Sequence, residues 1–209
     1  MNKKFLTTFI LLFCLTFGVG VSAATQVVPV KKLNVPYYKQ QYPNSCEAAS
    51  LRMALAYYKI KKTDMQILKQ FGYAPTYRDW GKNVWTDPQK QYVGYVDIVG
   101  RPNGGYGVYG LPVVRAIESF KRKGVYATST AITPTMLATN IQKGYPVMIW
   151  GYTSFTEPAY TWTTPEGNEV KAFKGEHARL VVGYKGTLKK PIGFYVHDPY
   201  TNEAYKYWP

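Results

Sequence analysis

Cysteine is scarce in this sequence, and its scarcity excludes a fold held together by disulfides. The 209 residues include two cysteines, Cys14 and Cys46. Cys14 lies in an apolar N-terminal run that we expect to be cleaved off, so the mature chain would keep one thiol and could form no internal disulfide. A free thiol outside the cell is either buried and inert or reactive. Cys46 therefore needs a structural or a chemical role.

Acidic residues are also few, 12 against 26 Lys and Arg, and the formal net charge is +14. Removing Lys3 and Lys4 with the N-terminal run lowers this charge to +12. Such a surface attracts polyanions. The basic residues are dispersed and form no known nucleic-acid-binding motif, so we expect no specific nucleic-acid partner. Adhesion to an anionic cell-envelope polymer and an ordinary solvated basic surface both stay open.

Long apolar runs are absent beyond the first residues. The opening MNKKFLTTFILLFCLTFGVGVSAA has basic residues first, then an apolar run, then small residues. This layout is typical of a secretory signal peptide, and an uncleaved membrane anchor is the alternative. We predict that residues 1–24 are a signal peptide cleaved after Ala23 or Ala24. Residues 25–209 would then be one domain, secreted or cell-wall associated, with no membrane contact after cleavage.

Metal-binding and phosphate-binding patterns are missing as well. The two histidines, His177 and His197, are too far apart for the paired spacing of zinc hydrolases, and no second mature cysteine is present. The GGYG stretch at 104–107 lacks the preceding strand and the lysine of a phosphate-binding loop. We therefore predict no metal and no cofactor.

Helical periodicity dominates the first part of the mature chain, and strand patterns dominate the last part. Asn44 and Glu47 have the spacing of a capping box, which predicts a helix over 45–58 with Cys46 in its first turn. Other helices are predicted over 64–71, with Thr63 as the cap, over 111–123, stopped by Gly124, and over 133–144, started by Thr133 and Pro134. Strands or hairpins are predicted over 146–152, 161–173, 177–184 and 192–199. This order predicts an α+β domain, with a helical N-terminal half packed on a mostly antiparallel C-terminal sheet.

The segment 73–110 fits neither pattern. It is rich in Gly, Pro, Tyr and Trp and has no sustained period, which predicts long irregular loops held by aromatic packing. Its aromatic content argues against disorder. The aromatic side chains either line a substrate cleft or close the core.

The residues with catalytic potential are Cys46, the two histidines and Asp198. A helix start exposes backbone N–H groups, so we expect a lowered pKa for the Cys46 thiol. A lone cysteine with distant His and Asp partners is typical of cysteine hydrolases. Neighbouring residues on a strand point to opposite faces, so His197 is poorly placed to bond Asp198. This leaves His177 as the base for Cys46 and Asp198 as its partner, with His197 at the surface or behind the site.

Five motifs in order, LNVPYYKQ, PNSCEAASLRMAL, PVMIW, GEHARLVVGY and VHDP, resemble the C39-like peptidase family, relatives of the papain-type cysteine proteases. The resemblance covers residues 33–199. It implies a papain-like cysteine peptidase fold. It also implies that Cys46 is the nucleophile, that His177 is the base and that Asp198 orients the base.

The resemblance further implies an oxyanion-hole glutamine shortly before the cysteine, and we favour Gln40 over Gln41. Its amide and the backbone N–H of Cys46 would together stabilise a tetrahedral oxyanion. One departure concerns Glu47, which follows the nucleophile where the peptidase domains of bacteriocin exporters carry glycine. A role in clipping leader peptides therefore does not carry over to this chain.

The sequence as a whole predicts a secreted, monomeric cysteine peptidase that hydrolyses peptide or amide bonds, with a peptide or cell-wall peptide as substrate. A peptidoglycan amidase or transpeptidase would use the same residues. One alternative outside the enzymes is a catalytically silent papain-like binding module for cell-envelope polymer or peptide. Another is an interaction protein in which Cys46 forms an intermolecular disulfide.

Overall fold

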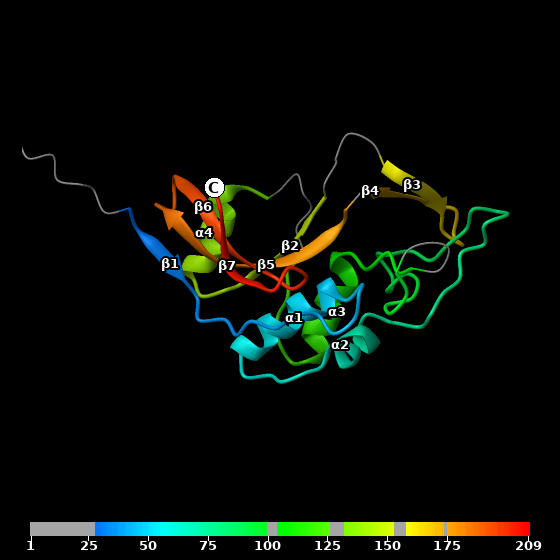
Figure 1. Ribbon diagram of the computed structural model, residues 1–209, viewed down its shortest axis with the longest axis horizontal. Coiled ribbons are helices and arrows are strands. Elements are labelled where there is room, and N and C mark those ends of the chain that lie inside the picture. The colour runs from blue at the N-terminus through cyan, green and yellow to red at the C-terminus, as the bar shows by residue number, and fades with distance from the viewer. Residues whose placement is uncertain (1–27, 100–103, 126–131, 153–157, 174) are drawn as a thin grey trace, which may run out of the picture.

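The computed structural model of the protein describes residues 28–99, 104–125, 132–152, 158–173 and 175–209 (Figure 1). The predicted signal peptide lies outside these residues. The helices are α1 (Cys46–Tyr57), α2 (Asp64–Gln70), α3 (Gly110–Ser119) and α4 (Pro134–Gln142). The strands are β1 (Val30–Lys32), β2 (Val147–Gly151), β3 (Pro158–Thr163), β4 (Glu169–Phe173), β5 (His177–Gly186), β6 (Pro191–Asp198) and β7 (Glu203–Trp208). No helix within the described ranges is long and apolar enough to cross a membrane.

The architecture confirms the predicted α+β class with an antiparallel C-terminal sheet. The main sheet has the order β1-β5-β6-β7, and β2 pairs with the first half of β5 while β1 pairs with its second half. Every pairing in this sheet is antiparallel. Figure 1 shows α1, α2 and α3 gathered on one side of the sheet, and α4 packs against β1, β2, β5 and β6. The long strand β5 is therefore the centre of the fold.

Local capping signals hold for some helices and fail for α1. Thr63 caps α2, as the sequence predicts, and the structure adds both hydrogen bonds of a capping box with Gln66. The N-cap of α1 is Ser45 and not Asn44, whose side chain donates instead to the carbonyls of Tyr95 and Ile98. Glu47 does not reach back to a cap either, because its side chain is fully buried beside Cys46. The predicted capping box at α1 is thus wrong.

The two other helices keep their predicted starts more closely than their ends. Thr133 caps α4 and Pro134 is its first residue, as predicted. The helix α3 ends at Ser119, several residues before the predicted stop at Gly124. Gly124 instead packs against Ile117 of that helix.

The segment 33–40 is extended and is joined to the C-terminal strands by hydrogen bonds. The Leu33 carbonyl accepts from the Tyr205 hydroxyl, the Tyr37 hydroxyl donates to the Asp198 carbonyl, and the Gln40 N–H donates to the Pro199 carbonyl. These bonds hold the segment against the C-terminal strands a few residues before α1 begins at Cys46. Pro36 fits here because this segment makes no continuous ladder.

The irregular segment after α2 closes an aromatic-rich core of its own, as the aromatic-packing prediction requires. Trp85, Val93 and Tyr106 of this segment pack on Trp162 and Ala172 of the β3–β4 hairpin. The two indole rings of Trp85 and Trp162 are 5.4 Å apart. Figure 1 shows the hairpin at the end of the molecule away from β1, with the irregular segment beside it. The hairpin therefore has its own aromatic support.

His197 is fully buried, so the surface position is wrong, and of the two predicted positions the one behind the site is left. Its Nδ1 accepts from the Tyr205 N–H, so the neutral ring donates from Nε2 to the Val35 carbonyl at 3.0 Å. Burial lowers the pKa of His197. The imidazole thus joins β6, β7 and the extended segment as a neutral structural group.

We predict that part of the acid sensitivity of the fold comes from His197. Its lowered pKa means that the unfolded chain binds a proton that the folded chain resists, so stability falls as the pH drops below about 6.5. In His197→Gln this part of the pH dependence is lost, and the free energy of unfolding at neutral pH falls by about 2 kcal/mol because two buried hydrogen bonds are disturbed. Urea unfolding of both proteins at about pH 7.5 and pH 5.5 measures both effects. An identical pH dependence in the two proteins would contradict this role.

Candidate active site

Cys46 is the first residue of α1 and is 8% exposed. The first N–H groups of a helix have no partner within the helix, so this position places a backbone donor that the helix does not use next to the thiol. Cys46 Sγ lies 3.3 Å from Glu47 Oε2, to which it donates, and 3.4 Å from the Ala178 nitrogen, from which it accepts. The thiol is therefore held between the helix start and the first residues of β5.

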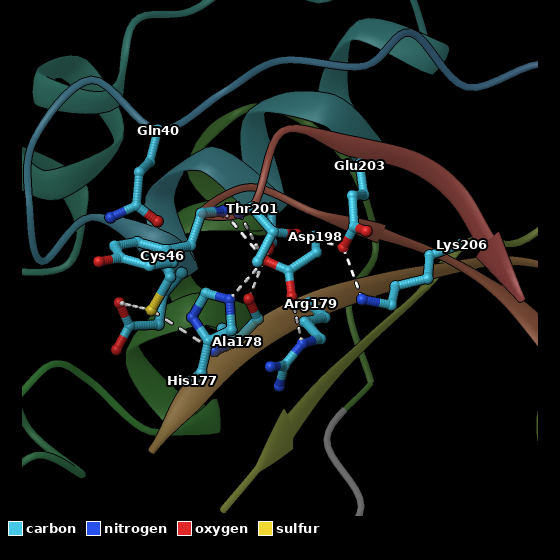
Figure 2. A network of polar contacts seen from close by, with 12 residues as sticks. Gln40, Cys46, His177, Ala178, Arg179, Asp198, Thr201, Glu203 and Lys206 are labelled. Carbon is cyan, nitrogen blue, oxygen red and sulfur yellow. Dashed lines mark hydrogen bonds and ion pairs between the residues drawn. The ribbon is translucent and has the colours of Figure 1, made fainter. Parts of the chain in front are cut away.

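His177 and Asp198 form the hydrogen bond that the sequence predicts. His177 Nε2 lies 2.7 Å from Asp198 Oδ1, and Figure 2 shows the imidazole between the Cys46 sulfur and this carboxylate. A neutral imidazole that donates from Nε2 has its acceptor lone pair on Nδ1. Nδ1 is then the nitrogen that can accept a proton from a thiol.

Asp198 is almost completely buried and accepts several other hydrogen bonds. Arg179 Nε donates to Oδ2 at 2.7 Å, and the Tyr200 N–H donates to Oδ1 at 3.0 Å. Burial by itself would raise the pKa of Asp198, but the hydrogen bonds from His177 and Arg179 outweigh burial and hold that pKa well below its usual range. Asp198 is thus an anion whose position is set from several directions.

The network continues past Asp198 to the last strand. The Thr201 N–H donates weakly to Asp198 Oδ1, and the Thr201 hydroxyl donates to Glu203, which is paired with Lys206 (Figure 2). The Glu203–Lys206 pair is exposed and contributes little stability by itself. It does connect the Asp198 turn to β7.

The two candidate glutamines point in different directions. Gln41 is bonded to Asp64 at the start of α2, through its backbone N–H and its side-chain oxygen. Gln40 Nε2 donates to the carbonyls of Tyr42 and Pro43, directly before α1. Gln40 is therefore the glutamine on the Cys46 side, and both of its N–H donors are engaged by the backbone.

The sequence pattern did not assign Arg179 or Glu176 to the site. Residues 177 and 179 lie on one face of β5, so the alternation that pairs His177 with Asp198 also brings Arg179 to the same carboxylate. Glu176 directly precedes β5, and its carboxylate approaches the Glu47 carboxylate and the Cys46 thiol. The sequence feature that could have indicated both residues is that a charged side chain lies close to His177 on each side, Glu176 before it and Arg179 after it.

The surroundings of the thiol overturn the expected low pKa. Burial, and then the negative charges of Glu47 and Glu176, raise the pKa of the Cys46 thiol well above its ordinary value. Burial also raises the pKa of Glu47 to about 7, although the Val108 N–H bonds its carboxylate. The pKa of Glu176 is raised by burial and by Glu47, against the charge of Arg179. The helix start alone therefore does not decide the ionisation of Cys46.

Comparison with known proteins identifies a family and a similar solved structure. A family model described as "Peptidase_C39 like family" matches residues 32–209. A crystal structure from Bacillus anthracis, of a protein assigned as a C39-like peptidase, is similar with a TM-score of 0.68 and 26% sequence identity. The similarity covers 86% of this chain and 88% of that one. Among proteins with curated descriptions, none matches the sequence.

We predict that Gly107 is required for the position of Glu47. A Cβ atom at Gly107 would overlap Glu47 Oε1, and its φ of +119° is strained for any other residue. Gly167, in the β3–β4 turn, is the matched control, because its φ is +88° and no atom lies within 4 Å of the methyl carbon that alanine would add. Gly167→Ala should cost about 1 kcal/mol and Gly107→Ala at least about 2 kcal/mol more in urea unfolding. Equal losses in both variants would show that the Glu47 pocket tolerates displacement.

Proposed function

The chain belongs to the Peptidase_C39 like family, and from that premise we propose that it is a secreted cysteine peptidase that hydrolyses peptide or amide bonds. The observation that carries the proposal is the partly buried hydrogen bond of 2.7 Å between His177 and Asp198, beside the only thiol of the described residues. A histidine that is held by a buried carboxylate next to a helix-start cysteine has the parts of a nucleophile and its base.

The reaction begins with transfer of the Cys46 thiol proton to His177 Nδ1. In the described arrangement the thiol donates to Glu47, so the Cys46 side chain has to turn toward the imidazole before this transfer. The sulfur then attacks the carbonyl carbon of the substrate, and the carbonyl oxygen becomes an oxyanion. Asp198 stabilises the imidazolium, and Arg179 keeps Asp198 in place.

The oxyanion would be bound by the backbone N–H of Cys46 and by Gln40. For this, Gln40 gives up one of its bonds to the Tyr42 and Pro43 carbonyls and turns that N–H toward the substrate. His177 then protonates the leaving amine, which departs as the C–N bond breaks and a thioester forms. Water, deprotonated by His177, attacks the thioester, releases the acid and returns the proton to the thiol.

The substrate is proposed to be a peptide or the peptide part of cell wall, with no cofactor. The net positive charge of the chain favours retention at an anionic cell envelope after secretion. An amidase or transpeptidase of peptidoglycan would use the same steps, with a different bond or a different acceptor of the acyl group.

A second candidate is a catalytically silent binding module for cell-envelope polymer or peptide. The observations that favour it are the raised pKa of Cys46 and the occupied donors of Gln40. Both observations describe the site without a bound peptide. In a silent binding module, Cys46 and Gln40 would keep this arrangement when a peptide or polymer binds.

We predict that Cys46→Ala and His177→Ala each lower hydrolysis at least about 10³-fold, because each removes a step that the others cannot replace. Degradation of a mixed peptide library, followed by mass spectrometry, measures this loss. Cys46→Ala should lower the unfolding midpoint only slightly, since it removes one small side chain and one weak thiol hydrogen bond to Glu47. Retained hydrolysis together with a large loss of stability would show that Cys46 is only a core residue.

We also predict that Gln40→Ala lowers kcat by a factor of about 10² to 10³ with little change in KM, as loss of one oxyanion donor does. Gln41→Ala is the matched control. It removes the same group from the next residue, which is bonded to Asp64, so it should lower stability and leave kcat unchanged. Equal kcat values for the two variants would remove Gln40 from the proposed oxyanion hole.

A further inference from the structure

Three metal-binding side chains meet at the start of α1. Ligand atoms of Cys46, Glu47 and Glu176 all lie within 4.8 Å of one another. Cys46 and Glu47 belong to the first turn of the helix, and Glu176 comes from the residue before β5. The sequence predicts no metal because it has no paired histidines and no second mature cysteine. This cluster uses one cysteine and two carboxylates, a combination that those criteria do not cover.

Neither carboxylate of this cluster forms an ion pair among the described residues. Glu47 Oε1 accepts from the Val108 N–H and Oε2 from the Cys46 thiol, both of them neutral donors. Glu176 Oε1 is buried and has no hydrogen-bond partner in the described part of the chain. The charge of the nearby Arg179 guanidinium acts on Glu176, but its ion pair is with Asp198. Two buried carboxylates at such short range require a proton or a cation between them.

We propose that Cys46 Sγ and the carboxylates of Glu47 and Glu176 form a binding site for a thiophilic divalent cation such as Zn²⁺. Thiolate and carboxylate oxygens are both common zinc ligands. An ion about 2.3 Å from the sulfur and about 2.0 Å from the oxygen would span the 3.3 Å between Cys46 Sγ and Glu47 Oε2 with an angle of about 100°. This angle is close to the tetrahedral value, and water would take the fourth position.

The residues around the three ligands hold them in place and leave them within reach of an ion from solvent. The Val108 N–H fixes the Glu47 carboxylate from behind, which is the role of an outer hydrogen bond in metal sites. Gly107 leaves room for both carboxylates, since a Cβ atom there would lie against Glu47 and 3.5 Å from Glu176 Oε2. Cys46 is 8% exposed and Glu176 is half-buried, so the ligands lie just below the surface.

Binding would switch the nucleophile off reversibly. The ion displaces the thiol proton to solvent, forms a bond to sulfur and occupies the electron pair that would attack a substrate. This consequence rests on the proposed function of Cys46, whereas metal binding does not. A chelator would restore the free thiol.

Two other arrangements predict different behaviour. A proton shared by Glu47 and Glu176 would neutralise the pair and leave no metal affinity. An ion held by Cys46 and His177 would bind without the carboxylates. Variants of Glu176 and His177 separate these cases.

The test uses the full chain with Cys14→Ser, so that Cys46 is the only thiol. Co²⁺ titration is followed by the charge-transfer absorption of a thiolate–cobalt bond, and Zn²⁺ affinity is measured by calorimetry. We expect one ion per chain, and a loss of affinity of more than about tenfold in Glu47→Gln and in Glu176→Gln. Glu166→Gln, which removes an exposed carboxylate from the hairpin turn, should bind like the parent. His177→Ala should also keep the absorption band.

Alkylation of Cys46 by iodoacetamide gives an independent measure. Zn²⁺ should slow the reaction in the parent and in Glu166→Gln, and a chelator should reverse the effect. Glu176→Gln should lose this protection. Should Glu47→Gln fail to fold, Glu176→Gln alone decides, because Glu176 precedes the strand and its side chain is half-buried.

The absence of an absorption band in the parent, or a band lost in His177→Ala and kept in Glu176→Gln, would overturn the proposed site. Peptide hydrolysis without metal affinity would leave the proposed function standing and remove the metal site. Metal affinity without hydrolysis of any peptide would leave the metal site standing and remove the proposed function.

Discussion

The register of β5 against β6 is the constraint on which the rest of the site depends. Leu180 pairs with His197, so Arg179 lies opposite Asp198, and His177 reaches the same carboxylate along the strand. A slip of one residue would turn these side chains to the other face of the sheet. The register is held by buried residues such as Leu180 and Val196. The hydrophobic core and the polar network therefore support the same alignment.

The same strand brings α1 to the site. The Ala178 N–H donates to Cys46 Sγ, and the Ala178 carbonyl accepts from the Ser50 hydroxyl one turn further along the helix. These bonds place the thiol against β5 at the point where the histidine begins the strand. The extended segment 33–40 completes the arrangement, because it is bonded to the ends of β6 and β7 before it enters α1. Cys46, His177 and Gln40 are thus positioned by one set of strands.

The environment of Cys46 combines opposing effects. The helix start and the Ala178 N–H favour a thiolate, whereas burial and two carboxyl groups oppose it. Glu47 accepts the thiol hydrogen bond that the proposed mechanism requires His177 to accept. A carboxyl group there ties the reactivity of the thiol to whatever neutralises Glu47 and Glu176, a proton or a cation. The resting arrangement of the site and its proposed metal affinity share this cause.

The sequence alone determined the features that depend on short-range signals or on scarcity. The cap of α2 at Thr63 and the start of α4 at Pro134 follow from side chains within three residues of the helix end. The pairing of His177 with Asp198 could be predicted because few histidines were available and because strand residues alternate. The α+β class followed from helical periodicity in the first part of the chain and strand patterns in the last.

Only the tertiary structure decided where polar side chains with several possible partners would bond. Glu47 has the spacing of a capping residue, yet a buried pocket formed by Gly107 and Val108 takes its carboxylate. Asn44 bonds carbonyls some fifty residues away, and Arg179 and Glu176 join the site through strand and loop contacts that no local pattern shows. The pKa of Cys46 follows from these distant neighbours. A capping bond contributes about 1 kcal/mol, which is less than the cost of leaving a buried carboxylate without partners. Once the fold buries Glu47, its carboxylate therefore bonds the Val108 N–H and the Cys46 thiol and not the helix cap.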